Sequence, residues 1–126
     1  MSQPNTMRLD RLLANMGYGS RRDIGLLANA DRIVLDGVPV EDVDQHIALT
    51  PDLPTRLQVN GQPIDPLPGM AIMLHKPLGA ICSHKEAGTL VYDLLPPRWK
   101  SREPKLSSIG RLDKETTGLL LITDDG

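Results

Sequence analysis

Arg111 and Asp113 are the residues of this 126-residue chain whose types and spacing could do chemistry. In an extended segment, side chains alternate between two faces, so both would lie on one side of the chain and Leu112 on the other. An ionised carboxylate held beside a cation can act as a nucleophile or as a base. An Arg-x-Asp triplet alone is more often an ordinary surface ion pair, so the flanking residues must decide between these interpretations.

Glycines and an apolar run flank this pair. Gly110 and Gly118 allow tight backbone paths on either side of it. Residues 119–122 form a short, continuously apolar segment that an Asp-Gly turn signal follows. The pattern predicts an acidic residue on a rigid support, followed by a buried strand.

The whole string, GRLDKETTGLLLITDDG at residues 110–126, resembles the catalytic motif of the bacterial ribosomal pseudouridine synthases. In that family the aspartate is catalytic and the arginine fills the space left by a flipped uridine, so the resemblance implies these roles for Asp113 and Arg111. Residues 73–83 are similar to the family's strand, Lys-Pro-x-Gly turn and second strand. This part of the resemblance adds Lys76 to the candidate RNA-binding residues.

The resemblance implies isomerisation of uridine to its carbon-linked form, with no cofactor and no metal. The bond from base to ribose breaks, the base rotates, and the two are rejoined. The aspartate would attack the sugar, attack the base or remove a proton, and the sequence leaves these alternatives open. The base must also leave its stack, which costs a few kcal/mol and requires a grip on the surrounding RNA. A second, RNA-holding part of the chain is therefore expected.

The first third of the chain predicts a pair of helices. Apolar residues recur at helical spacing over residues 9–16, and Ser20 with Asp23 three positions later is an N-cap pattern for a second helix. Arg21 and Arg22 fall in its first turn, where the helix dipole disfavours cations. A phosphate bound there would reverse this penalty, although two solvated surface arginines are an equal alternative without further context.

Residues 8–59 as a whole resemble the alpha-L (S-four-type) RNA-binding domain. The resemblance rests on Arg-Leu-Asp-x-x-Leu-Ala at residues 8–14, Ser-Arg-Arg at residues 20–22 and a valine-rich hairpin with an Asp-Gly turn. It departs at residues 29–31, where the family usually has a glycine before the strand. It implies RNA contacts from the basic residues Arg8, Arg11, Arg21, Arg22 and Arg32.

The formal net charge of −2 speaks mildly against a nucleic-acid partner, but the charges are unevenly distributed. Residues 8–32 carry five basic and three acidic groups, and residues 75–105 carry six and three. Residues 36–65 carry one basic and six acidic groups. We therefore expect this acidic segment to face away from RNA phosphates.

The single cysteine, Cys82, excludes an internal disulfide and fits a reducing cytoplasm. A metal site built from His75, Cys82 and His84 does not have a standard zinc spacing, and packing in a strand is the favoured interpretation. No apolar run approaches the roughly twenty residues that a membrane span needs. We expect a cytoplasmic protein whose partner is ribosomal RNA, with no membrane and no metal.

The predicted fold class is α+β. We expect a disordered lead-in at residues 1–6, an S-four-type RNA-binding domain with a helix pair and a β-hairpin at 7–59, and a linker at 60–69. Residues 70–126 would form the first part of a mixed-sheet pseudouridine synthase catalytic domain.

Members of that family run on beyond this point, so we expect an amino-terminal fragment with little or no activity of its own. Its strand at residues 119–122 would have an open edge through which the fragment could self-associate. The expected function of the intact protein is isomerisation of a specific uridine in ribosomal RNA. The alternative is an RNA-binding or assembly module without catalytic activity.

Overall fold

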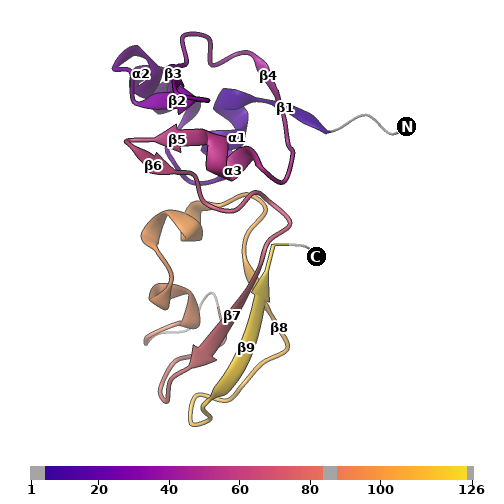
Figure 1. Cartoon of the computed structure of the whole chain (residues 1–126). Coiled ribbons are helices and arrows are strands. Elements are labelled where there is room, and N and C mark those ends of the chain that lie inside the picture. Colours follow the sequence, from indigo (N-terminus) through magenta and orange to yellow (C-terminus); the bar gives the residue numbers. More distant parts are fainter. Residues whose placement is uncertain (1–4, 84–87, 125–126) are drawn as a thin grey trace, which may run out of the picture. The chain divides into compact units, whose positions relative to one another are not determined.

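The computed structural model describes residues 5–83 and 88–124. The chain divides into two compact units, residues 1–67 (unit 1) and residues 68–126 (unit 2), each coloured along the sequence in Figure 1. Both units combine short helical segments with antiparallel strands, so the predicted α+β class is confirmed.

Unit 1 contains the predicted helix pair. The helices are α1 (Leu9–Asn15) and α2 (Arg21–Asn29). The Asp23 amide donates to Ser20 Oγ at 3.1 Å, and the Ser20 amide donates to the Asp23 carboxylate at 2.9 Å, which confirms the predicted capping of α2. The apolar face predicted for α1 is fully buried, at Leu9, Leu12, Leu13 and Met16.

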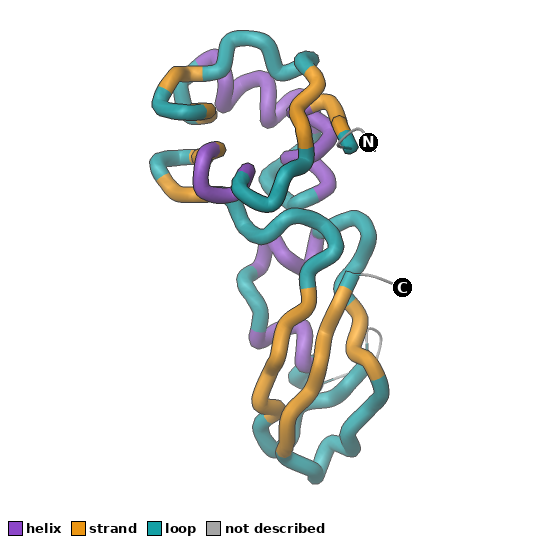
Figure 2. Tube along the Cα trace, turned by 45° about the vertical axis from the view of Figure 1, so that its right-hand side comes forward, coloured by secondary structure: helices purple, strands orange, loops and turns teal. Residues whose placement is uncertain are grey.

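Two antiparallel sheets complete unit 1 (Figure 2). The first pairs β1 (Thr6–Arg8) with β4 (His46–Ala48). The second has the order β3-β2-β5-β6, formed by β3 (Val38–Pro39), β2 (Ile33–Leu35), β5 (Leu57–Val59) and β6 (Gln62–Pro63), with α3 (Leu53–Arg56) before β5. Asp36 and Gly37 connect β2 to β3 with φ values of 52° and 82°, as a tight hairpin requires, so the predicted Asp-Gly turn is confirmed.

The ordered part of unit 1 extends beyond both expected boundaries of the RNA-binding domain, residues 7 and 59. Thr6 and Met7 belong to β1, whereas residues 1–4 of the expected lead-in lie outside the described residues. The start of the expected linker, residues 60–64, forms β6 and its turn. Ile64 is 5% exposed in the core, and its amide donates to the Leu57 carbonyl at 3.1 Å. Burial of this isoleucine attaches the segment to unit 1.

Unit 2 is built on an antiparallel sheet with the order β7-β9-β8. Its strands are β7 (Ala71–Lys76), β8 (Ser107–Ile109) and β9 (Gly118–Thr123), and the short 3-10 helices η1 (Val91–Leu94) and η2 (Pro97–Ser101) lie between β7 and β8 in the chain. The second strand expected after the Lys-Pro-x-Gly turn is reduced to one parallel bridge, Ile81 to Leu90.

The strand β9 is the central strand of this sheet, because β7 pairs along one side of it and β8 along the other. The strand predicted at residues 119–122 is thus confirmed. The expectation that it has an open edge is wrong at Leu121 and Ile122, which pair with β8, but the register of β8 does not extend to Leu119 and Leu120. Self-association through this edge stays a prediction.

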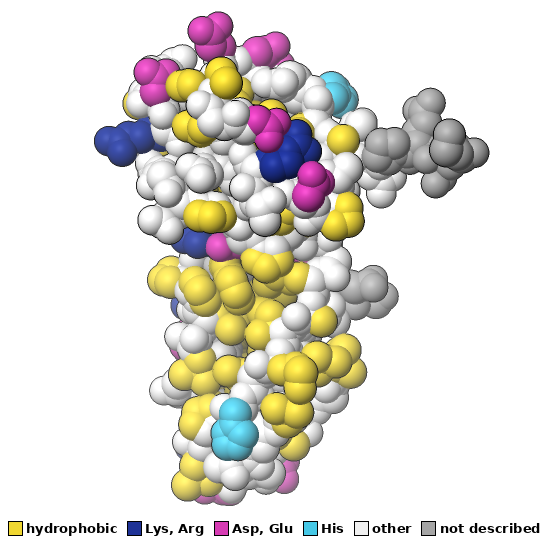
Figure 3. Space-filling model, in the orientation of Figure 1, with side chains coloured by type: hydrophobic (Ala, Val, Ile, Leu, Met, Phe, Trp, Pro, Cys, Tyr) yellow, Lys and Arg dark blue, Asp and Glu magenta, His cyan; other side chains and the backbone are white. Residues whose placement is uncertain are grey.

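Side chains of β9 alternate between a covered and an uncovered face. Leu120 and Ile122 are 3% and 0% exposed, whereas Leu119 and Leu121 are 63% and 39% exposed. The segment is therefore buried on one face only, although its continuously apolar sequence predicted a buried strand. Figure 3 shows apolar side chains gathered over β7 and β9 on the uncovered face.

Asp31 ends α2 in the left-handed region, with φ 59°. The Asp31 amide donates to the Ala28 carbonyl at 3.0 Å, and the Arg32 amide donates to the Leu27 carbonyl at 2.9 Å. These two bonds are those of a Schellman motif, whose left-handed residue is usually glycine. Asp31 therefore forms the helix end in the left-handed conformation without a glycine.

We expect Asp31→Gly to stabilise unit 1 by about 1 kcal/mol, because glycine removes the steric penalty of the left-handed conformation. Urea denaturation followed by helical circular dichroism measures this, since α1, α2 and α3 all belong to unit 1. Asp31→Ala is the control and should give no gain. An equal gain from alanine and glycine would contradict the argument.

Candidate functional site

Asp113 lies in the loop between β8 and β9. Gly110 opens this loop with a φ of 76°, and the Thr116 amide donates to the Asp113 carbonyl at 2.9 Å, which closes a turn. Residues 111–113 belong to no regular strand. Arg111 and Asp113 are nevertheless exposed while Leu112 between them is partly buried, which agrees with the expected alternation.

Lys76 fastens this loop to the end of β7. Its side chain is 0% exposed, and its Nζ donates to the backbone carbonyls of Pro77 at 3.1 Å, Lys114 at 3.2 Å and Thr116 at 2.6 Å. The Gly79 amide also donates to the Lys114 carbonyl, at 2.8 Å. The Lys-Pro-x-Gly turn therefore binds the segment that directly follows Asp113.

Complete burial corrects the prediction that Lys76 contacts RNA. A buried ammonium is unfavourable unless its three donors find acceptors, and here three backbone carbonyls accept them. Its role in the structure is to support the Asp113 loop. The Lys-Pro-x-Gly resemblance identified the residue, but its type alone could not distinguish a buried support from an exposed contact.

Leu112 anchors the same loop from between the two exposed residues. Its side chain is partly buried and packs against the core of unit 2, and its amide donates to Cys82 Sγ at 3.5 Å. Cys82 is itself buried, as the packing interpretation expected, whereas His75 is exposed and His84 lies outside the described residues. Within residues 5–83 and 88–124, no group of three His, Cys, Asp or Glu side chains could hold a metal ion.

We expect Lys76→Met to lower the free energy of unfolding of unit 2 by about 2 kcal/mol or more, because the buried carbonyls lose a charged donor. Trp99, the single tryptophan of the chain, packs against the core of unit 2, so its fluorescence during urea denaturation reports on this unit. Lys114→Ala is the matched control, since only the backbone carbonyl of Lys114 takes part. Equal stability of the two variants would refute the supporting role.

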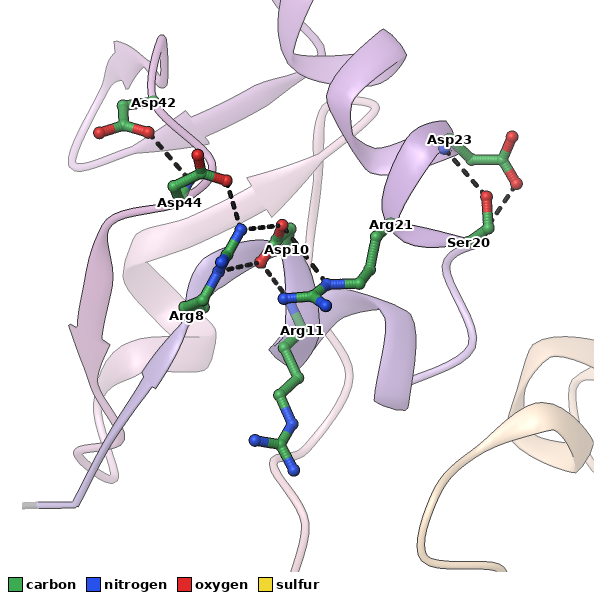
Figure 4. Close-up of polar contacts among 8 residues, drawn as sticks. All are labelled: Arg8, Asp10, Arg11, Ser20, Arg21, Asp23, Asp42 and Asp44. Atoms are coloured by element: carbon green, nitrogen blue, oxygen red, sulfur yellow. Dashed lines mark hydrogen bonds and ion pairs between the residues drawn. The ribbon is translucent and has the colours of Figure 1, made fainter.

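Arginines of unit 1 converge on Asp10 (Figure 4). Its carboxylate accepts hydrogen bonds from the Arg8 guanidinium at 3.0 and 3.2 Å and from the Arg11 amide at 2.7 Å, and Arg21 Nε lies 3.6 Å away. The Asp10 side chain is 6% exposed, against 39% for Arg8 and 53% for Arg21. The structure thus joins two of the predicted RNA-binding arginines through an acidic residue that the sequence analysis missed. Its position two residues after Arg8, in the first turn of α1, was the available signal.

Asp44 also reaches Arg8. Its carboxylate accepts from Arg8 Nη2 at 2.5 Å, and the Asp44 amide donates to the Asp42 carboxylate at 2.9 Å. Pairing of β1 with β4 places Arg8 opposite His46, which brings the acidic segment beside the arginine. The acidic segment, which we expected to face away from RNA phosphates, therefore contacts one of the arginines predicted to bind RNA.

The remaining predicted arginines stand outside this cluster. Arg11 contributes only its amide, and in Figure 4 its side chain points away from Asp10. Arg22 and Arg32 have exposed side chains, one in the first turn of α2 and one after its end. The five arginines thus lie along the helix pair without forming one cluster.

Hydrogen bonding and burial act in opposite directions on Asp10. Burial raises the pKa of its carboxyl, but the bonds from Arg8 and the Arg11 amide outweigh burial, so the pKa lies below its ordinary value. A depressed pKa in the folded state contributes stability that is present above the unfolded-state pKa of about 4 and is lost as the pH falls.

Asp10→Asn should therefore destabilise unit 1 at neutral pH and flatten the fall in its stability below about pH 4. Helical circular dichroism during urea denaturation at a series of pH values checks this. Glu41→Gln changes an exposed carboxylate outside the cluster and serves as the control. Parallel pH profiles for Asp10→Asn and wild type would rule out this contribution.

Sequence comparisons place the chain among known proteins. The profile of the RNA pseudouridylate synthase family matches residues 70–126, which include Lys76 and the Asp113 loop. An uncharacterized RNA pseudouridine synthase of Bacillus subtilis, YtzG, is 40% identical over 121 residues, covering 95% of this chain and 48% of its own length. The chain belongs to the RNA pseudouridine synthase family.

Two further members of the pseudouridine synthase family carry names that state a substrate. Ribosomal small subunit pseudouridine synthase A of Pseudomonas aeruginosa is 37% identical, over 95% of this chain and 50% of its own. Ribosomal large subunit pseudouridine synthase B of Escherichia coli (strain K12) is 32% identical, over 94% of this chain and 41% of its own. The chain spans about half the length of the curated relatives it matches or less.

No helix among the described residues of this chain has the length and apolar character to cross a bilayer.

Proposed function

We propose that the protein isomerises a specific uridine of ribosomal RNA to pseudouridine, with Asp113 as the catalytic carboxylate. One observation carries this proposal: Asp113 is exposed on a loop that Lys76 and Leu112 fasten, within the residues that match the family. The printed names of two relatives concern the small and the large ribosomal subunit, which supports ribosomal RNA as the substrate and the cytoplasm as its location.

The proposed reaction is an internal rearrangement. The carbon–nitrogen bond between ribose and base breaks, the base rotates, and a carbon–carbon bond forms at C5. The C5 hydrogen leaves as a proton, and the ring nitrogen that lost the ribose takes up a proton, so the product is an isomer of the substrate. Asp113 would attack the sugar or the base, or take up a proton. Because no net oxidation occurs, the reaction needs no redox cofactor. Arg111, two residues away in the same exposed loop, would occupy the space that the flipped uridine leaves.

Unit 1 would supply the grip on RNA that base flipping requires. We assign it as the S-four-type RNA-binding domain, with phosphate contacts from Arg8, Arg11, Arg21, Arg22 and Arg32. All five side chains are exposed or partly exposed in the structure. Contacts of this kind give affinity that falls steeply with salt and carries little sequence information.

The 126-residue chain alone should show little or no isomerase activity, because the relatives it matches are about twice its length or more. The rival function is an RNA-binding or assembly module without chemistry. The separate core of unit 1 and its exposed arginines favour that alternative. The role of Asp113 discriminates between the two.

A chimera tests the proposed chemistry. This chain would replace the matching half of the Pseudomonas aeruginosa small-subunit synthase, and release of tritium from C5 of uridine in ribosomal RNA would be measured. The chimera should release tritium, and Asp113→Asn should reduce the rate by at least about a thousandfold, as expected when a catalytic nucleophile or base is removed.

Glu115→Gln is the matched control, because Glu115 is an exposed carboxylate two residues further along the same loop. It should retain activity close to that of the parent chimera. Full activity of Asp113→Asn would remove Asp113 from the mechanism, and a chimera that binds RNA without isomerising it would favour the binding module.

A further inference from the structure

We propose that Asp10 is a positioning residue that holds Arg8 and Arg21 together as one phosphate-binding site for an RNA backbone, and that Asp44 opposes binding there. This inference rests on the RNA-binding role proposed above for unit 1. It adds an acidic residue to a site that would otherwise be described by its cations alone.

Asp10 contacts the guanidinium groups of two arginines, one at the N-terminal end of α1 and one at the N-terminal end of α2. Arg8 precedes α1 and binds Asp10 through Nε at 3.2 Å and Nη2 at 3.0 Å. Arg21 begins α2 and approaches the same carboxylate through Nε at 3.6 Å. None of these contacts uses Nη1 of Arg8 or either Nη of Arg21. These groups are the donors available to a phosphate oxygen.

The buried carboxylate makes this arrangement favourable before RNA arrives. Two neighbouring guanidinium groups repel each other, and one anion between them removes that repulsion while leaving an excess of positive charge. An arginine that is already held loses less side-chain freedom when it binds a phosphate. Because the Asp10 side chain is 6% exposed, it holds the arginines from the protein side and leaves their outer surfaces to the ligand.

Asp44 acts on the same arginine from the solvent side. Its side chain is 69% exposed and contacts Arg8 Nη2, the nitrogen that also binds Asp10. An exposed carboxylate at this place offers Arg8 the kind of oxygen that a phosphate would offer. An incoming phosphate must therefore compete with Asp44 for Arg8 or approach against its charge.

These roles predict changes of opposite sign for two substitutions that alter the net charge equally. Asp44→Asn should tighten RNA binding by about two- to fivefold, since it removes one exposed ion pair. Asp10→Asn should weaken RNA binding by about fivefold or more, because the charge-assisted hydrogen bonds to Arg8 and the ion pair with Arg21 are lost. The measurement is fluorescence anisotropy of a fluorescein-labelled RNA stem–loop titrated with the 126-residue chain at several KCl concentrations.

The salt dependence separates positioning from a general loss of structure. Asp10→Asn should reduce the slope of log affinity against log salt by about one, the loss of one phosphate contact. Helical circular dichroism checks that each variant is folded. Arg21→Lys keeps Asp10 and the formal charge but loses the planar fork, and should bind about threefold more weakly.

The positioning role would be overturned if folded Asp10→Asn bound RNA as tightly as wild type or more tightly. Undiminished RNA binding by Arg21→Lys would overturn it too. Weaker binding by Asp44→Asn would overturn the opposing role of Asp44. Failure of the wild-type chain to bind the stem–loop at low salt would overturn the proposed RNA-binding function itself, together with this inference.

Discussion

The candidate catalytic loop depends on the hydrogen bonds that the buried ammonium group of Lys76 donates to backbone carbonyls. It lies fully buried at the end of β7 and binds the carbonyls of Pro77, Lys114 and Thr116. Lys76 pairs with Gly118 in the sheet register, so the same residue belongs to the sheet and to the base of the loop. A loop held in this way can expose Asp113 without losing its shape.

In each unit, a buried charged residue supports exposed residues for which we propose a function. In unit 2 the cation of Lys76 gathers backbone carbonyls, and in unit 1 the carboxylate of Asp10 gathers the arginines Arg8 and Arg21. A buried charge is tolerated only when its hydrogen-bonding capacity is filled, so each fixes the geometry of its partners. The proposed chemistry and the proposed RNA binding thus depend on residues that are not themselves exposed.

Local patterns in the sequence predicted the elements that local forces determine. The capping pair Ser20 and Asp23, the helix pair and the Asp36-Gly37 turn follow from spacing and residue type, and the structure contains all of them. Predictions that depended on pairing between distant segments were less successful. The contact of Asp44 with Arg8 joins residues 36 apart in the sequence, and the contact of Lys76 with Lys114 joins residues 38 apart. The central place of β9 depends on the order of the whole sheet. The family resemblance identified Lys76 and Asp113 as candidates, but only packing shows that Lys76 supports the loop that carries Asp113.

The most direct test of this account is the backbone mobility of the loop that carries Asp113. Nitrogen-15 relaxation of the wild-type chain would give amide order parameters for residues 111–117 and for β9. If Lys76 holds the loop, the loop values should be close to those of β9, near about 0.85. Loop values below about 0.6 beside a rigid β9 would contradict it, because Lys76 would then not hold Asp113 in place.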